Sequence, residues 1–217
     1  MHAGETAAEF VVRNTRATRP TLVPEIELLL GNMVIPLWQL VESEFEVQGL
    51  APPYWAFAWP GGQALARYIL DDPAIARGRT VLDFASGSGI AGIAAARSGA
   101  LSVLCADTDP FAAAACALNG ARNQVSLHTT TEDLIGTDLV PDLVLAGDIC
   151  YDRNMSSRSV KWLEELALKG ATVLLGDPGR NYLPKTGLAY LTDYSIKTSL
   201  DLEDREMRRT DVYRLTA

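Results

Sequence analysis

The chain has 217 residues, of which 48% are hydrophobic and 21% are charged, a balance that excludes general disorder and fits one domain with an extension. The formal charge of −8 argues against a nucleic-acid substrate, because phosphates repel an acidic surface. With only His2 and His128 as histidines, the sequence predicts no metal site, and no apolar run is long enough to span a membrane.

Cysteine usage and the first residues indicate the compartment. Cys105, Cys116 and Cys150 lie in apolar stretches without CxxC spacing, so we expect buried thiols in a reducing environment. Glu5 and Glu9 stand where a secretory signal would have a basic end followed by an apolar block. A bacterial cytoplasm is therefore expected, or the mitochondrial matrix if the protein is eukaryotic, with the chain acting as a monomer.

The first 60 residues do not follow a regular alternation of strands and helices. The apolar runs at residues 26–30 and 33–40 are compatible with strands. We interpret residues 1–60 as an N-terminal extension that packs on a core formed by residues 61–217. The aromatic residues of the extension are interpreted as core or wall residues: Trp38, Tyr54, Trp55 and Phe57.

From Thr80 onward, short β-rich runs alternate with helical segments, which predicts an α/β fold whose mostly parallel sheet has helices on both faces. The predicted helices are residues 88–98, 110–122 and 155–169. After them, residues 190–198 and 211–215 predict a terminal hairpin, which places an antiparallel strand in the sheet. The five earlier strands are predicted at residues 80–84, 101–106, 125–129, 142–146 and 171–175.

A glycine-rich turn follows the first predicted strand. Gly87, Gly89 and Gly92 form GxGxxG at the opening of a helix, which also fits a nicotinamide dinucleotide site. Asp83, just before the turn, would repel a pyrophosphate there, whereas a cationic ligand with an ammonium group gains from an acid. The pattern therefore favours S-adenosylmethionine as the cofactor. The turn residues expected to bind it are Ala85, Ser86, Gly87 and Gly89.

Acidic residues after the second and third strands are candidates for the ribose and adenine of the same cofactor. Asp107 can accept hydrogen bonds from both ribose hydroxyls, and Thr108 beside it is a further cofactor-binding candidate. Asp109 is better explained as the cap of the helix that begins at Pro110. Glu132 is assigned to the adenine amino group, although a turn or helix cap explains it almost as well.

Several separated motifs resemble one enzyme family. The run VLDFASGSG (residues 81–89) matches the first glycine motif of class I methyltransferases, with Ala85 where many members have glycine. More specific are WPGGQAL (residues 59–65), GDICYD (147–152) and GDPGR (176–180). Together they resemble the protein-lysine methyltransferases that modify the beta subunit of electron transfer flavoprotein, within the wider family that has a D-x-x-Y signature.

This resemblance implies a Rossmann-like sheet of seven strands with the last antiparallel, S-adenosylmethionine as the cofactor, and a lysine of the electron transfer flavoprotein beta subunit as the substrate. It also implies that the D-x-x-Y pair, Asp148 and Tyr151, lies at the methyl-transfer site and that Trp59 lies close to the cofactor. Asp148, also expected to touch the cofactor, should orient the substrate amine rather than deprotonate it, since a carboxylate favours the charged amine.

Other functions stay open. A ribosomal-protein methyltransferase is the first alternative, because residues 119–123 (NGARN) resemble that group as well. An NAD-dependent oxidoreductase fits the GxGxxG pattern alone, and a non-catalytic interaction protein could use the same scaffold. Arg180 has two interpretations that the sequence does not separate: it contacts the protein substrate or braces its own loop.

Overall fold

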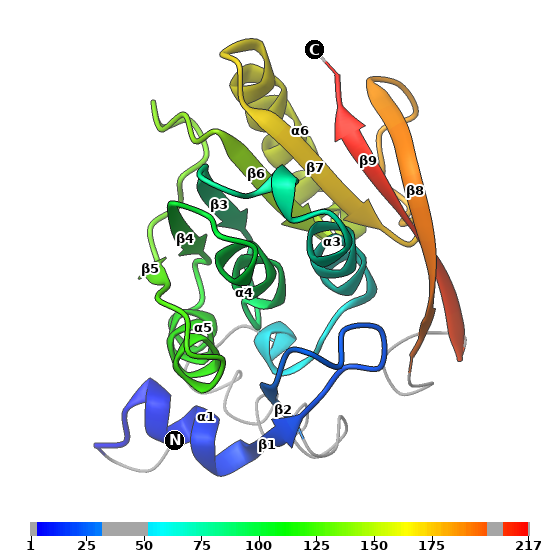
Figure 1. The fold of residues 1–217 in the computed structure, drawn as a ribbon. Helices are drawn as coiled ribbons and strands as arrows, with labels where there is room; N and C mark the ends of the chain where they lie inside the picture. Colours follow the sequence, from blue (N-terminus) through cyan, green and yellow to red (C-terminus); the bar gives the residue numbers. More distant parts are fainter. Residues whose placement is uncertain (1–3, 32–51, 199–205, 217) are drawn as a thin grey trace.

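The computed structural model describes residues 4–31, 52–198 and 206–216. Its centre is a seven-stranded sheet in the order β5-β4-β3-β6-β7-β9-β8 (Figure 1). The first five strands in this order are parallel, and β9 is antiparallel to both of its neighbours. The predicted α/β fold with an antiparallel last strand is therefore confirmed.

The bounds of the strands agree with most of the sequence predictions. The strands of the sheet are β3 (Thr80–Phe84), β4 (Ser102–Ala106), β5 (His128–Thr130), β6 (Leu143–Gly147), β7 (Thr172–Asp177), β8 (Leu188–Lys197) and β9 (Met207–Leu215).

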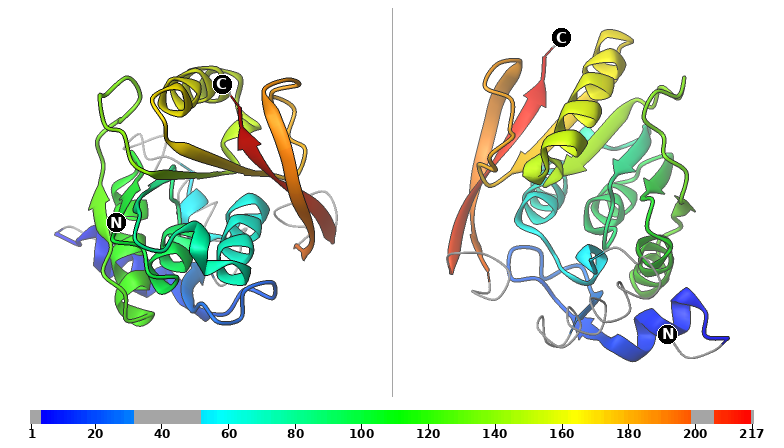
Figure 2. Two further views of the ribbon diagram at one scale, coloured as in Figure 1. Left: turned by 45° about the horizontal axis from the view of Figure 1, so that its top comes forward. Right: turned by 180° about the vertical axis from the view of Figure 1, so that it is seen from behind.

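Helices cover the sheet on both faces (Figure 2). One face packs on α3 (Pro60–Asp71) and α4 (Ile90–Arg97), where Leu65, Ile69 and Ile93 are fully buried. The other face packs on α6 (Arg153–Leu168) through Trp162, Leu163 and Leu166. The alternating strand residues explain this division, since Val81 faces the first layer and Leu82 the second.

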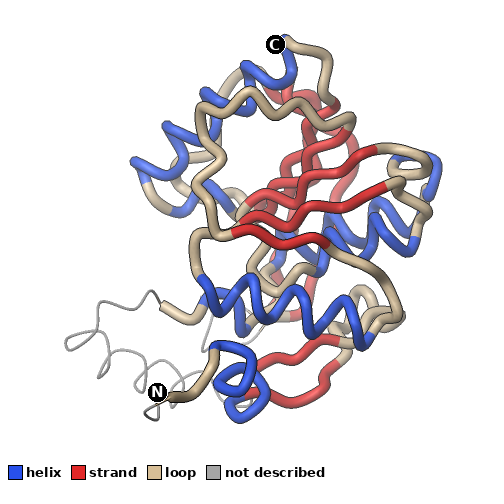
Figure 3. Tube along the Cα trace, turned by 90° about the vertical axis from the view of Figure 1, so that its left-hand side faces the viewer, coloured by secondary structure: helices blue, strands red, loops and turns tan. Residues whose placement is uncertain are grey.

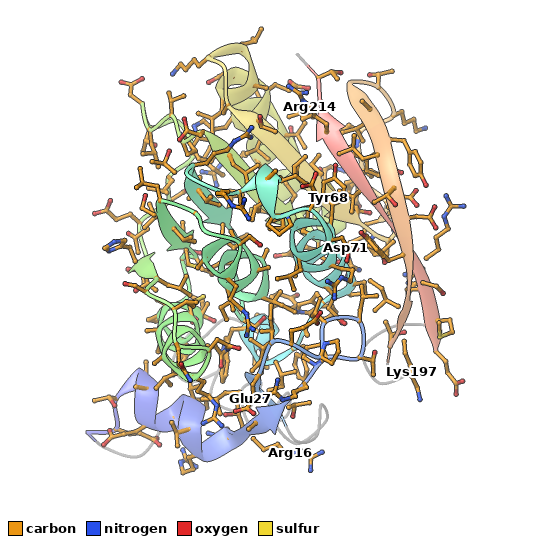
Figure 4. All side chains as sticks on the ribbon, viewed as in Figure 1. Arg16, Glu27, Tyr68, Asp71, Lys197 and Arg214 are labelled. Carbon is orange, nitrogen blue, oxygen red and sulfur yellow. The ribbon has the colours of Figure 1, made fainter. Side chains whose placement is uncertain are left out.

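Residues 4–31, within the expected N-terminal extension, contact mainly α5 (Pro110–Arg122). They contain α1 (Ala7–Asn14) and an antiparallel ladder of β1 (Thr15–Thr18) with β2 (Leu28–Gly31), which lie beside α5 in Figure 3. Phe10 of α1 packs 4.9 Å from Phe111 of α5, centroid to centroid. Glu27, labelled in Figure 4, accepts a hydrogen bond from Arg122 Nε at 3.0 Å. These contacts join the extension to the helix that follows β4.

The third parallel strand differs from its prediction. We expected residues 125–129, but β5 begins at His128. The Val125 N–H instead returns to the Gly120 carbonyl of α5 at 3.0 Å, after Gln124 reverses the chain with a φ of 58°. Val125 therefore closes the helix rather than pairing with β4, and its half-buried side chain packs against the hydrophobic core.

Two helix starts also differ from their predictions. Helix α6 begins at Arg153 rather than residue 155, directly after its cap Asp152. Helix α4 begins at Ile90 rather than residue 88, because Gly87 and Gly89 adopt φ values of 52° and 77° that an α-helix cannot contain. Helices α1 and α3 were not predicted at all. The strand expected at residues 26–30 is present as β2, whereas residues 33–40 and Trp38 lie outside the described residues.

Candidate functional site

A cavity of about 780 Å³ opens at the carboxyl ends of β3, β4 and β6, where open α/β sheets place their ligands. Most residues predicted from the sequence lie in its wall: Trp59, Ala85, Gly87, Asp107, Thr108, Glu132, Asp148 and Tyr151. Three others do not line the cavity: Ser86 and Gly89 belong to the glycine turn itself, and Asp83 is the buried residue just before it.

Asp83 supports the turn from below. Its side chain is buried, and Oδ2 accepts a hydrogen bond from the Gly92 N–H at 2.8 Å, in the first turns of α4. Burial raises the pKa of this carboxyl group to about 7, and the Gly92 hydrogen bond opposes the rise. The geometry therefore assigns Asp83 to holding the turn against α4. The sequence favoured a direct contact between Asp83 and the cofactor ammonium. In the structure the carboxylate points toward α4 and does not line the cavity.

The glycine turn is compressed against α5. A Cβ on Gly89 would lie 2.9 Å from Cys116 Sγ, so a larger residue has no room there. Ser86 Oγ lies 3.3 Å from the same sulfur. Ala85 adopts a φ of 53° although it has a side chain, at a cost of about 1–2 kcal/mol. The turn thus keeps the shape of the glycine motif despite the alanine.

Asp107 closes the turn from the side of β4. Its Oδ2 accepts the Gly87 N–H at 2.9 Å, and its Oδ1 accepts the Asp109 N–H at 3.1 Å. Burial raises the pKa of Asp107 above its ordinary value. Asp109 accepts the Phe111 N–H at 2.8 Å, which confirms its prediction as the cap of α5. Asp107 therefore stands in the cavity wall with its carboxylate already oriented.

The part of the cavity wall that follows β5 combines an acid with apolar side chains. Glu132 is exposed and follows β5, and its N–H donates to Thr130 Oγ1 at 3.1 Å. Leu134 and Ile135 line the same region and supply apolar walls. Sequence analysis missed the ion pair at this rim, in which Arg158 Nη2 of α6 lies 2.7 Å from Asp133 Oδ2.

Asp148 is the most constrained side chain of the cavity. It is 9% exposed and has a φ of 57°, a strained value for a residue with a side chain. Oδ1 accepts hydrogen bonds from Arg180 Nη2 at 2.8 Å and Nε at 3.2 Å, and Oδ2 accepts the Gly62 N–H at 3.2 Å. Burial raises the pKa of Asp148 to about 6, against the lowering effect of the Arg180 guanidinium.

Glycines bring α3 close enough to reach Asp148. A Cβ on Gly61 would collide with the Gly176 carbonyl oxygen and lie 2.6 Å from Asp148 Oδ2. A Cβ on Gly147 would lie 2.7 Å from the Gly62 nitrogen. The first turn of α3 therefore rests on the ends of β6 and β7, where only glycines fit. This packing explains why three of the motifs in the sequence contain glycine.

Arg180 reaches Asp148 from the end of β7. Asp177 Oδ1 accepts the N–H groups of Gly179 at 2.7 Å and of Arg180 at 2.6 Å, which shapes the turn. The Arg180 guanidinium lies 5.6 Å from the ring centroid of Trp59. The sequence left open whether Arg180 contacts the protein substrate or braces its own loop. In the structure its side chain lines the cavity and pairs with Asp148. The sequence carried no signal for its pairing with Asp148.

Three aromatic residues, Tyr54, Trp59 and Tyr151, form an aromatic wall beside this ion pair. The Tyr54 ring lies 5.4 Å from that of Tyr151 and 5.9 Å from that of Trp59, and Tyr151 is 47% exposed. The Trp59 Nε1–H donates to the Tyr54 carbonyl at 2.8 Å. Trp55 and Phe57 are buried in the core, as predicted. Tyr54 lines the cavity and is therefore a wall residue.

Within residues 4–31, 52–198 and 206–216, no group of three or more histidine, cysteine, aspartate or glutamate side chains is arranged to hold a metal ion. Over the same residues, no helix combines the length and apolar character needed to cross a bilayer.

Comparison with known proteins gives matches at the level of family. The electron transfer flavoprotein beta subunit lysine methyltransferase of Xenopus laevis is 41% identical over 211 residues, 94% of this chain and 85% of that protein. The protein of the same name from Homo sapiens is 35% identical over 94% of this chain and 80% of its own. The ribosomal protein L11 methyltransferase of Vibrio cholerae serotype O1 is 32% identical, but over 63% of this chain and 49% of that protein.

A family model for ribosomal protein L11 methyltransferase (PrmA) matches residues 64–149. Among solved structures, magnesium protoporphyrin IX methyltransferase of Synechocystis PCC 6803 with bound SAM has a TM-score of 0.52 at 15% identity, covering 82% of this chain and 96% of that chain. At that identity the likeness establishes the fold alone. The full-length relatives at 35–41% identity establish more: the chain belongs to the electron transfer flavoprotein beta subunit lysine methyltransferase family.

Proposed function

We propose that this protein transfers a methyl group from S-adenosylmethionine to a lysine of the electron transfer flavoprotein beta subunit. The observation that carries the proposal is the buried carboxylate of Asp148 at the carboxyl end of β6, beside the aromatic wall. A carboxylate and aromatic ring faces together form a site for a cationic amine.

The charge of the cavity supports a cationic cofactor. Among the described residues, six carboxylate side chains line the cavity against the two arginines Arg158 and Arg180. Such a lining attracts the sulfonium and ammonium groups of S-adenosylmethionine and repels the pyrophosphate of a dinucleotide, which disfavours the oxidoreductase alternative. The carboxylates are Asp107, Asp109, Glu132, Asp133, Asp148 and Asp152.

The positions of the lining residues suggest how the cofactor is held. We assign Asp107 and Thr108 to the ribose and Glu132 to the adenine amino group, with Leu134 and Ile135 beside the adenine ring. Trp59 and the turn at Ala85 and Gly87 complete the binding surface. Behind that surface, Asp83, Ser86 and Gly89 keep the turn in shape rather than touching the cofactor.

Methyl transfer requires the sulfur, the methyl carbon and the attacking nitrogen to be nearly collinear, so positioning supplies much of the rate. S-adenosylmethionine, when bound, supplies a methyl group bonded to a positively charged sulfur. Asp148 binds and orients the lysine, while Tyr151 offers a ring face and a hydroxyl group. A free lysine has a pKa of about 10.4 and arrives protonated, and a carboxylate beside it favours the charged form. Asp148 is therefore assigned to binding and orientation, and the proton is expected to leave through water.

The direct test uses labelled S-adenosylmethionine and purified electron transfer flavoprotein, with the labelled site located by mass spectrometry. We expect label on a lysine of the beta subunit. The Asp148→Asn variant should lose about 30- to 150-fold in rate, since a charge-assisted contact contributes about 2–3 kcal/mol. Wild-type protein that leaves every lysine of the beta subunit unlabelled would refute the proposed substrate, and full activity of the variant would refute the role of Asp148.

Ribosomal protein L11 is the second candidate substrate, because the PrmA model matches the centre of the chain. That match covers residues 64–149 and so includes neither Trp59 nor Tyr151 nor Arg180. Purified L11 belongs in the same assay, and labelling of L11 in preference to electron transfer flavoprotein would favour this alternative. Labelling of neither protein, with intact function in cells for Asp148→Asn, would favour an interaction protein.

The remaining expectations concern its state in the cell. We infer that the protein acts as a monomer in a reducing compartment, a bacterial cytoplasm or the mitochondrial matrix, and does not bind nucleic acid. The three cysteines, all within the described residues, are buried and unbridged, which fits reducing conditions. Light scattering and a gel-shift measurement test the first and last of these expectations.

A further inference from the structure

The cation-binding position of the cavity already contains a cation from the protein itself. Arg180 donates two hydrogen bonds to Asp148 Oδ1, and its guanidinium lies against the Trp59 ring. Both side chains of the ion pair are largely shielded, with 16% and 10% exposed. A lysine ammonium that bound to Asp148 and the aromatic wall would need the space that the Arg180 guanidinium occupies. It would also need the negative charge of Asp148, which Arg180 already neutralises.

The acceptor sites of Asp148 are also nearly filled. A carboxylate has about four lone-pair positions, two on each oxygen. Both positions on Oδ1 are used by Arg180, and one on Oδ2 is used by the Gly62 N–H. One position on Oδ2 is left for an incoming ammonium, which needs close contact with the carboxylate to compensate for its lost hydration. The two cations therefore compete.

We propose that Arg180 is a resident cation that occupies the lysine-binding position on Asp148 and gives way to the substrate ammonium, which makes Arg180 a specificity-determining residue of the methyl-transfer site. This proposal rests on the proposed function, since it assumes a lysine substrate. The Arg180 side chain then has two states, one paired with Asp148 and one turned away from it.

Charge gives a physical reason for such a residue. Asp148 is buried, and a buried carboxylate without a cation partner tends to take up a proton and become neutral. Arg180 opposes this and keeps the carboxylate ionised until an ammonium takes over. Only the side chain has to move, because the hydrogen bonds to Asp177 hold the Arg180 backbone in its turn.

A static role makes the opposite prediction. If Arg180 stayed on Asp148 during catalysis, its removal would leave the carboxylate poorly placed, and kcat would fall while KM stayed equal or rose. If Arg180 is displaced, its removal eliminates a competitor, and KM for the lysine substrate falls. For a pair populated about 90% of the time, the apparent affinity improves about tenfold when the competitor is absent.

The experiment measures kcat and KM for purified electron transfer flavoprotein at pH 8.5, with wild type, Arg180→Lys and Arg180→Met. We expect KM to fall about tenfold in Arg180→Met and by less in Arg180→Lys, because lysine cannot form the two-pronged contact and stacks less well on Trp59. Arg209→Met is the matched control: Arg209 pairs with Asp193 and Asp211 on the exposed β8–β9 hairpin, and we expect wild-type kinetics.

A pH series adds a second readout. Among the described residues, the charged and titratable groups that face Asp148 are Arg180 and Asp177 from the end of β7 and Cys150, two residues further along the chain, while α3 contributes the Gly62 N–H. Without Arg180, Asp148 should take up its proton at a higher pH. The lower KM of Arg180→Met should therefore appear at pH 8.5 and disappear toward pH 6.

The outcomes separate the two proposals. Wild type that methylates electron transfer flavoprotein, together with an Arg180→Met KM that is unchanged or raised, overturns the resident-cation proposal and leaves the function intact. Wild type without this activity overturns the function. Calorimetry with S-adenosylhomocysteine checks the fold of each variant. If Arg180→Met does not bind this ligand, Arg180→Lys decides: a KM below that of wild type supports the resident-cation proposal, and an equal or higher KM overturns it.

Discussion

At the scale of single residues, Asp148 combines backbone strain, burial and charge. Its φ of 57° turns the carboxylate away from the direction that β6 would give it and toward α3 and Arg180. Strained residues persist only where the surrounding structure holds them, and they cluster at functional sites. Here the Gly62 N–H, the Asp148 N–H bond to the Gly176 carbonyl at 2.9 Å, and Arg180 hold the residue.

The pKa of Asp148 predicts an acid limit to activity. We expect kcat/KM to fall as the pH drops through about 6, because the protonated carboxyl group no longer attracts an ammonium. The fold responds in the opposite direction. The folded protein binds this proton more tightly than the unfolded chain, because burial raises the pKa of Asp148 from 3.8 to about 6. The stability contributed by Asp148 therefore increases as the pH falls from about 6 to about 3.8.

Initial rates and circular dichroism between pH 5 and 8 measure the two effects separately. A rate that drops only where the circular dichroism signal is also lost would show acid unfolding rather than titration of Asp148. Asp83, whose pKa of about 7 also exceeds its ordinary value, changes stability with the same sign and has no direct contact with the cavity.

At the scale of elements, the approach of α3 to β6 and β7 is the packing on which the site depends. Gly61→Ala should destabilise the fold by about 1–3 kcal/mol or more, because its Cβ meets the rigid carbonyl of Gly176. Gly62→Ala is the matched control in the same helix, since its Cβ would lie 3.0 Å from the movable Ile90 Cγ2. Thermal denaturation compares the two, and equal losses would contradict the proposed close approach.

Helix α5 links the N-terminal extension to the glycine turn through Asn119, which is completely buried. Its Oδ1 accepts the Leu29 N–H of β2 at 2.7 Å, and its Nδ2 donates to the Ser88 carbonyl at 2.9 Å. Asn119→Leu keeps the size but leaves two buried backbone groups unpaired, so we expect a loss of about 2–6 kcal/mol.

Because one of those groups belongs to the turn, Asn119→Leu should also weaken the binding of S-adenosylhomocysteine, measured by calorimetry on the folded fraction. A matched variant is Asn14→Ala at the end of α1, whose half-buried side chain donates to the Phe10 carbonyl within its own helix. If both variants bind the ligand like wild type, the extension has no influence on the turn.

At the scale of the whole molecule, the acidity of the chain and of its cavity act together. The formal charge is −8, and the cavity lining repeats this excess. We expect S-adenosylmethionine to bind more weakly as the salt concentration rises, because salt screens the attraction of exposed charges. Calorimetry at two salt concentrations tests this, with NADH as the contrasting ligand. Tight binding of NADH would contradict the assignment of the cavity.

The sequence by itself determined the features that depend on neighbouring residues. The alternation of strands and helices, the turn at residues 85–89 and the cap at Asp109 follow from periodicity and from contacts between residues close in the chain. The resemblance of the motifs was sufficient to identify the family. Even here local patterns had limits, since Val125 was assigned to a strand but completes α5.

Only the tertiary structure decided what meets across the sheet. The pairing of Arg180 with Asp148, the contact of Gly61 with Gly176 and the orientation of Asp83 toward α4 depend on the order of the strands and on how closely helices pack. These contacts carry no periodic signal, because the residues come from different elements and meet only when the sheet has formed. Most of the site residues predicted from the sequence therefore lie in the wall of one cavity, whereas their partners could not be predicted.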